Sequence, residues 1–245
     1  MDITQTTHIS LCTGYGGIDL GLRRVLPNLR TVAYAEIEAF ACENLLARME
    51  AGQLEAAPIW SDLKSFPWES FRGLVDILSG GYPCQPFSAA GFRKGTDDPR
   101  HLWPFIADGI RRMVPKVCFF ENVEGHITLG LRNVISELAL LGYKTAWGIF
   151  SAAEVGAPHQ RRRVFILANS LRERGQLPIE REQSAEQMSG GESEAWRAWR
   201  TWPVKPGVCR SNDGASNRVD RLRLLGNGVV PATAEKAFRT LWNQL

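Results

Sequence analysis

Short apolar runs alternate with stretches of helical periodicity through the first two-thirds of the chain. The apolar runs predict buried strands at residues 8–12, 31–35, 75–78, 116–120, 143–150 and 163–168. Helical spacing predicts helices at residues 18–25 and 232–242. A further helix is expected to follow Glu38 and to end at Met49. This alternation predicts an α/β fold in which helices cover both faces of a parallel sheet.

The pattern of strands and helices stops near Asn169. Residues 171–200 are polar and charged, which is typical of a linker or an insert, and a tryptophan-containing loop follows them. We therefore expect three parts. Residues 1–169 carry the sheet, residues 170–222 form a short separate region, and residues 223–245 return to the sheet with the last helix.

Composition restricts the class of protein only mildly. The net charge of +3 permits a polyanionic partner without requiring one. The five cysteines form neither a CxxC pair nor a Cys/His cluster of zinc spacing, so we expect reduced thiols and no metal. The N-terminus is polar and no apolar run reaches about 18 residues, so we expect a cytoplasmic protein without a membrane span.

A glycine-rich turn at residues 14–17 separates the first strand from the first helix. Glycines there let backbone N–H groups approach a ligand. Glu36 ends the next strand and could accept hydrogen bonds from ribose hydroxyls. Asp62 follows an expected third strand and could accept one from an adenine amino group. Asp19 replaces the third glycine of a dinucleotide pattern, which favours a nucleoside without a pyrophosphate. A structural turn with two surface acids is the alternative.

Cys84 lies in a loop, residues 80–88, that contains two glycines and two prolines. Two glycines leave the preceding strand, and Pro83 and Pro86 stiffen the loop on either side of the thiol. A buried structural cysteine needs no such loop, although an isolated cysteine is more often inert than reactive. The loop therefore predicts a nucleophile.

Three further segments carry candidate chemistry. Glu121 follows an apolar strand, where partial desolvation would raise its pKa and let it hold a proton at neutral pH. Arg161 and Arg163, two residues apart, are expected on the same side of an extended chain, where they could hold a phosphate or a base carbonyl. Asn227 lies between glycines before the last helix. The alternatives are an ordinary acidic loop residue for Glu121, a solvated basic edge for the arginines and a helix cap for Asn227.

Together these segments resemble the cytosine-C5 DNA methyltransferase family, in the order of that family and over nearly the whole chain. The similar segments are residues 11–17 (methyl-donor loop), 81–88 (Pro-Cys loop), 100–103, 121–123 (Glu-Asn-Val), 159–163 (Gln-x-Arg-x-Arg) and 226–229. The resemblance implies a Rossmann-like sheet of S-adenosylmethionine-dependent methyltransferases with a small, reduced target-recognition region.

The resemblance also implies roles for individual residues. S-adenosyl-L-methionine would be the co-substrate, held by Cys12, Thr13, Gly14, Tyr15, Gly16, Gly17, Glu36, Ile37, Asp62, Leu63, Pro83, Leu102, Asn227 and Val229. The catalytic residues would be Cys84, Glu121, Arg161 and Arg163. The DNA-contacting residues would be Gln85, Ser88, Arg93, Arg210 and Arg218. No metal is implied.

The implied reaction is methyl transfer to a cytosine that has left the DNA stack. Cys84 would attack carbon 6, protonated Glu121 would donate to ring nitrogen 3, and Arg163 would hold the base carbonyl. The partner would be double-stranded DNA, bound by a monomer, with a cognate restriction endonuclease left open. The alternatives are an RNA (tRNA) cytosine methyltransferase, a non-catalytic DNA-binding protein and an NAD-dependent oxidoreductase.

The sequence departs from the pattern of this family in three places. Cys12 stands where an aromatic residue is usual, and His159 takes the glutamine position. The region before residue 223 is short and carries no convincing copy of the motif that normally supports target recognition. Recognition of DNA is therefore expected to be limited or built compactly.

Overall fold

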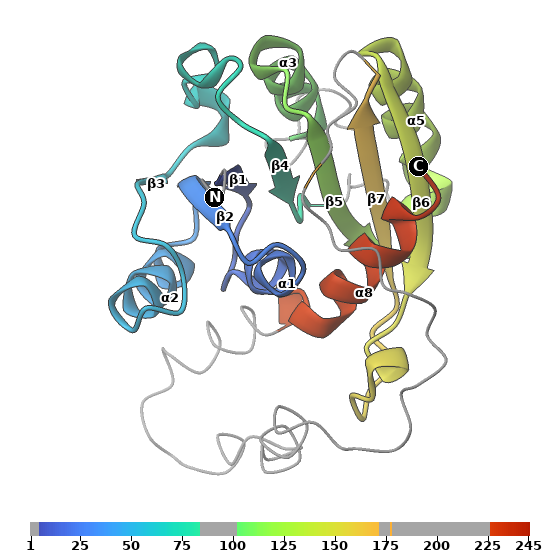
Figure 1. The fold of residues 1–245 in the computed structure, drawn as a ribbon. Helices are drawn as coiled ribbons and strands as arrows, with labels where there is room; N and C mark the ends of the chain where they lie inside the picture. The colour runs from blue at the N-terminus through green and yellow to red at the C-terminus, as the bar shows by residue number, and fades with distance from the viewer. Residues whose placement is uncertain (1–4, 84–101, 172–176, 178–225) are drawn as a thin grey trace, which may run out of the picture.

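The computed structural model describes residues 5–83, 102–171, 177 and 226–245. Within this part of the chain, seven strands form one sheet in the order β3-β2-β1-β4-β5-β7-β6 (Figure 1). The strands are β1 (Thr6–Leu11), β2 (Leu29–Ala35), β3 (Ile59–Trp60), β4 (Ile77–Gly80), β5 (Val117–Val123), β6 (Tyr143–Phe150) and β7 (Arg163–Ser170). The α/β class and the predicted strands are confirmed, including the third strand expected before Asp62, which is the short β3.

Helices pack on both faces of the sheet, as the sequence predicts. They are α1 (Gly17–Val25), α2 (Ala39–Glu50), α3 (Trp103–Met113), α4 (His126–Leu129), α5 (Leu131–Leu140) and α8 (Pro231–Trp242), with short 3-10 turns η1 (Leu63–Ser65), η2 (Trp68–Phe71) and η3 (Ala153–Val155). Alternate residues of β5 separate the two layers: Phe119 packs with α1 and α8, whereas Phe120 packs with α3 and α5. Both faces of β5 are therefore buried, which explains its continuous apolar sequence.

The prediction of an all-parallel sheet is wrong at one edge. Strands β1 to β5 pair in parallel, but β7 runs antiparallel to both β5 and β6. Only the turn η3 lies between β6 and β7, and a parallel pair would need a longer crossover, usually through a helix. The start of β7 therefore lies at the edge of the sheet where β1, β2, β4 and β5 end.

The last helix packs directly on the first (Figure 1). A Cβ atom added at Gly17 would lie 2.0 Å from the carbonyl oxygen of Val229, and one at Gly21 would lie 2.6 Å from that of Pro231. Two glycines on one side of α1 thus permit a backbone contact that any side chain would block. The predicted return of the C-terminal helix is confirmed, while the division into three parts stays a prediction.

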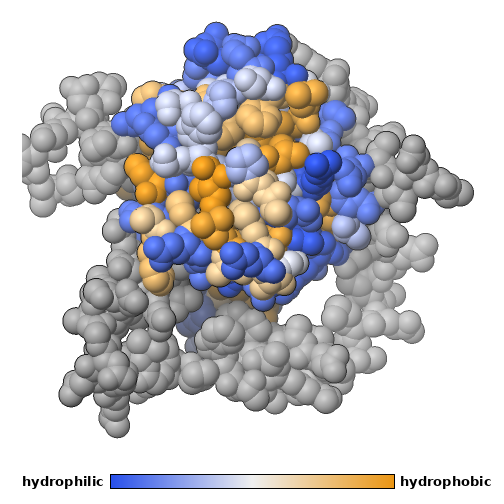
Figure 2. Space-filling view, turned by 90° about the vertical axis from the view of Figure 1, so that its left-hand side faces the viewer, coloured by the Kyte–Doolittle hydropathy of each residue, from blue (hydrophilic) through white to orange (hydrophobic). Residues whose placement is uncertain are grey.

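No helix in the described part of the chain combines the length and the apolar character needed to cross a bilayer. Several apolar side chains are nevertheless exposed, among them Ile37 (75%) and Leu46 (52%). Figure 2 views the side on which β3 and α2 lie, and it shows apolar residues gathered at the middle of this face with hydrophilic residues around them. Ile37 also lines the cavity described below.

Candidate active site

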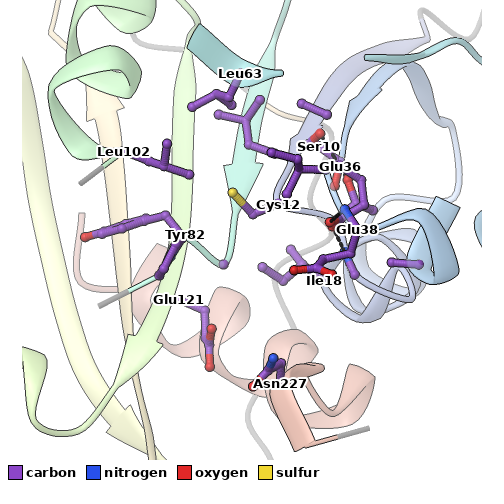
Figure 3. A pocket seen from close by; sticks show the side chains of 18 of the residues that line it. Ser10, Cys12, Ile18, Glu36, Glu38, Leu63, Tyr82, Leu102, Glu121 and Asn227 are labelled. Carbon is purple, nitrogen blue, oxygen red and sulfur yellow. Dashed lines mark hydrogen bonds between the residues drawn. The ribbon is translucent and has the colours of Figure 1, made fainter. Parts of the chain in front are cut away.

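A cavity of about 890 Å³ lies over the edge of the sheet where β1, β2, β4 and β5 end (Figure 3). Its lining reaches from Glu36 and Asp62, which follow β2 and β3, to Glu121 near the end of β5. Ligands of open α/β sheets bind at this edge, because the loops after parallel strands meet there. The cavity is within the size range of small-molecule sites.

Glu36 is held in place by the backbone at one end of the cavity. Its Oε2 accepts a hydrogen bond from the N–H of Gly14 (2.7 Å), and its Oε1 accepts one from the N–H of Glu38 (2.9 Å). Each carboxylate oxygen keeps a lone pair for a further donor. Asp62 is exposed and caps η1, with its Oδ1 accepting from the N–H of Lys64 (2.9 Å). Both acids are thus oriented before any ligand binds.

Cys12 and Asp19 lie beside the glycine turn and face the same cavity. Cys12 has a positive φ of 48°, and burial, together with the charge of Glu36, raises the pKa of its thiol to about 12. A thiol with this pKa stays neutral at physiological pH, so Cys12 offers an apolar contact rather than a nucleophile.

Asp19 belongs to a buried polar cluster that sequence reasoning did not assign to the site. Ser10 Oγ donates to its Oδ2 (2.9 Å), and His8 Nδ1 lies 3.6 Å from its Oδ1. Burial raises the pKa of Asp19 to about 6 and lowers that of His8 to about 3. The sequence does contain a signal for this role. Asp19 is an acidic residue in place of an expected glycine, and it lies in the first turn of a helix, where a negative charge is favourable.

Glu121 lies within β5, two residues before its end, and is 6% exposed. Burial raises the pKa of its carboxyl group to about 7, although the charges of Arg163 and Arg161 oppose this shift. Arg163 Nε lies 3.0 Å from Glu121 Oε1, across the antiparallel pair β5–β7. The predicted proton-carrying acid therefore has the expected direction of pKa shift. Arg163 contacts this acid directly, which the sequence did not predict.

Arg161 departs from its predicted geometry. Its φ is 37°, so residues 161–163 do not continue as an extended chain, and the two arginines contact different partners. The guanidinium of Arg161 donates to the carbonyl oxygen of Gly228, whereas that of Arg163 contacts Glu121. The alternation rule fails because it holds only for continuous β geometry, and β7 begins at Arg163.

Tyr82 lies in the first, described part of the predicted nucleophilic loop, two residues before Cys84, and two side chains hold it. Asn122 Nδ2 donates to the Tyr82 carbonyl oxygen (3.0 Å), and the Tyr82 hydroxyl lies 3.1 Å from His126 Nε2. Tyr82 is 3% exposed and Asn122 is 3% exposed. Asn122 thus fixes the root of the loop, a role that its place in the Glu-Asn-Val triplet could have signalled.

The structure brings most of the predicted donor-site residues together around the cavity. Those that line it are Cys12, Thr13, Gly14, Glu36, Ile37, Asp62, Leu63, Pro83, Leu102, Asn227 and Val229, with the catalytic candidates Glu121 and Arg163. Four predicted residues of the described part lie outside the lining, namely Tyr15, Gly16, Gly17 and Arg161. The remaining predicted residues, Cys84, Gln85, Ser88, Arg93, Arg210 and Arg218, lie outside the described residues.

The seven-stranded sheet, with β7 antiparallel near one edge, places the chain in the fold class of the solved Dnmt2 methyltransferase structures. Within that class, the chain belongs to the C-5 cytosine-specific DNA methylase family, whose model matches residues 6–197. The structure resembles that of the S. pombe Dnmt2 methyltransferase with a TM-score of 0.67 at 16% identity, covering 98% of this chain and 99% of that one. A variant of Spodoptera frugiperda DNMT2 gives a TM-score of 0.59 at 19% identity, over 74% of this chain and 54% of that one.

Curated relatives support the family at the level of sequence. The type II methyltransferase M.NgoMIV of Neisseria gonorrhoeae is 36% identical over 169 residues, which are 67% of this chain and 52% of that protein. The type II methyltransferase M.AquIA of Picosynechococcus is 30% identical over 186 residues, covering 69% of this chain and 74% of that protein. For the first few such relatives, the matched part of this chain spans only about half or less of their length.

Proposed function

We propose that this chain transfers a methyl group from S-adenosyl-L-methionine to carbon 5 of a cytosine in double-stranded DNA. The observation that carries the proposal is one continuous cavity, which runs from Glu36 to Glu121 and reaches Pro83, the residue before Cys84. A donor held at one end of this cavity and a base held at the other would share one enclosed space. Figure 3 shows Glu36 and Glu121 facing this space from opposite sides.

The residues at the β2 end fit an adenosyl sulfonium compound. The Glu36 carboxylate is already oriented by two backbone N–H groups and can accept from two neighbouring hydroxyls, as a ribose presents. Asp62 is exposed to accept from an amino group, and Leu63 and Ile37 offer apolar surface for a purine. When bound, the donor supplies an electrophilic methyl group. The carboxylate of Asp19, ionised above its pKa of about 6, adds negative charge beside a cationic ligand.

The residues at the β5 end fit a flipped cytosine. The sulfur of Cys84 would form a bond to carbon 6, which ends the aromaticity of the ring and makes carbon 5 nucleophilic. Glu121, whose pKa of about 7 leaves a substantial protonated fraction at neutral pH, would donate its proton to nitrogen 3 as negative charge develops there. Carbon 5 would then take the sulfonium methyl group, with S-adenosyl-L-homocysteine as the leaving group. Transfer of the carbon-5 proton to a base such as water, and return of the nitrogen-3 proton to Glu121, would restore the ring and expel the thiolate. The base would reach this pocket at a cost of a few kcal/mol for unstacking.

Double-stranded DNA as the substrate rests on the family and on its relatives, whose type II names favour a restriction-modification setting. Phosphate contacts by lysine and arginine side chains would make binding weaken as salt rises. Arg163 would reach the base carbonyl from its position beside Glu121, so one guanidinium would serve both the acid and the substrate.

The decisive experiment is transfer of a radiolabelled methyl group to duplex DNA, with a tRNA pool as a parallel substrate. We expect labelled 5-methylcytosine in the DNA. The variant Cys84→Ser should lose more than about 1,000-fold of the rate. Cys42→Ser is the matched control, because Cys42 Sγ donates to the Glu36 carbonyl oxygen and a serine hydroxyl can do the same. Label in tRNA alone, or full activity of Cys84→Ser, would refute the proposal.

A further inference from the structure

Residues 227–229 form a wall that reaches both ends of the cavity. All three line it, and Figure 3 shows Asn227 beside Glu121. A Cβ atom added at Gly81 would lie 3.1 Å from Glu121 Oε2, 3.9 Å from Val229 Cγ2 and 4.0 Å from Ile18 Cδ1. The side chain of Val229 therefore lies near Gly81, beside Glu121 on one side and the start of α1 on the other.

This wall has little secondary structure of its own to hold it. Residues 228–230 are neither helix nor strand, and α8 begins only at Pro231. Its position depends instead on contacts with distant parts of the chain. The carbonyl of Val229 rests against Gly17, where a Cβ atom would lie only 2.0 Å from its oxygen. A movement of about 1 Å would change the shape of the cavity at both ends.

Two side chains from different elements bind successive carbonyl groups of the wall. The hydroxyl of Tyr15, in the glycine turn, donates to the carbonyl oxygen of Val229. The guanidinium of Arg161, just before β7, donates to the carbonyl oxygen of Gly228. Both side chains are half-buried, and neither lines the cavity. The guanidinium of Arg48 lies over the ring of Tyr15, 5.4 Å from its centre, and restricts it further.

We propose that Tyr15 and Arg161 form a clamp on the carbonyl groups of Val229 and Gly228 that holds the wall against both the donor and the target base. Arg161 is then a positioning residue that acts through the wall, rather than a contact to phosphate or base. The clamp joins the glycine turn at the donor end with the start of β7 at the target end. This inference rests on the proposed function, because it assigns a donor to the cavity.

Binding of S-adenosylhomocysteine, measured by calorimetry without DNA, tests the clamp separately from methylation. Tyr15→Phe removes one hydrogen bond and should weaken binding about 3- to 10-fold. Arg161→Met removes a charged donor while keeping an extended side chain, and should weaken binding at least as much. Arg161→Lys keeps a donor for the carbonyl and should restore affinity to within about threefold of the wild type. If Tyr15 and Arg161 contacted only DNA, all three variants would bind S-adenosylhomocysteine with the wild-type affinity.

Matched controls come from the same sequence. Arg162→Gln changes the neighbouring arginine, which is half-exposed and pairs with Glu124 at 3.0 Å. Tyr34→Phe removes a tyrosine hydroxyl that donates to the Glu55 carbonyl oxygen at 3.1 Å, outside the cavity. Both controls should keep the wild-type affinity. Hydrogen exchange of the amides at residues 228–230 should speed up in Tyr15→Phe and Arg161→Met, and stay unchanged in both controls.

The double variant Tyr15→Phe/Arg161→Met shows whether the two residues act on one segment. If either substitution already releases the wall, the double variant should bind no more than about twofold more weakly than the weaker single variant. Fully multiplicative losses, or unchanged binding and exchange in both single variants, would overturn the clamp and leave the proposed function standing. A wild-type chain that binds no S-adenosylhomocysteine would instead overturn the proposed function, and the clamp with it.

Discussion

Replacing Gly17 with alanine tests how closely the C-terminal segment must approach the first helix. The added Cβ atom would lie 2.0 Å from the Val229 carbonyl oxygen and 2.9 Å from its carbonyl carbon. Cβ contacts below about 3 Å are not tolerated, so the segment must move by roughly 1 Å. Forced overpacking costs about 1–3 kcal/mol, and loss of the hydrogen bond from Tyr15 adds about 1 kcal/mol. The better helix propensity of alanine returns at most about 1 kcal/mol.

With the full helix-propensity gain subtracted, the net loss is about 1–3 kcal/mol, which for a chain of this size lowers the melting temperature by roughly 2–12 °C. Thermal unfolding followed by circular dichroism measures this directly. The control is Gly125→Ala, because Gly125 has a φ of −60° and no atom within 4 Å of an added Cβ. A Gly17→Ala variant that melts within 1 °C of the wild type would show that the contact is absent in solution. The reasoning about the wall would then fail.

Three further predictions concern single polar side chains. Glu121→Gln should lower the single-turnover rate about 100-fold at pH 6.5. The ratio of the wild-type rate to the variant rate should fall as the pH rises through about 7, because the wild-type acid loses its proton there. A ratio that stays constant with pH would contradict this role of Glu121. The raised pKa of Asp19 means that the folded state binds more protons than the unfolded one. As the pH rises from 4 to 6, the wild type should therefore lose about 2 kcal/mol of unfolding free energy relative to Asp19→Asn. Parallel urea midpoints of the two proteins across that range would exclude it. Asn122→Ala should remove the hydrogen bond to the Tyr82 carbonyl oxygen and cost about 1–3 kcal/mol in denaturant unfolding. It should also reduce the turnover number while the affinity for S-adenosylhomocysteine stays unchanged.

Hydrophobic periodicity and residue type are enough to predict the order of the elements and most of the residues around the cavity. Strands such as β5 are apolar on both faces, so their positions follow from composition alone. The acids Glu36 and Glu121 could be assigned to one edge because the carboxyl ends of parallel strands meet there. The direction of the Glu121 pKa shift also followed from its apolar neighbours along the chain.

Only the tertiary structure decided which groups meet across the sheet. The antiparallel direction of β7 depends on the connection after β6, and it places Arg163 beside Glu121. The contacts of Tyr15 with Val229 and of Gly17 with the same residue join parts of the chain more than 200 positions apart. Local patterns report burial and backbone conformation within a few residues, whereas such contacts depend on how whole elements pack. The sequence therefore identified the chemical groups, and the packing of α8 on α1 decided how they are held.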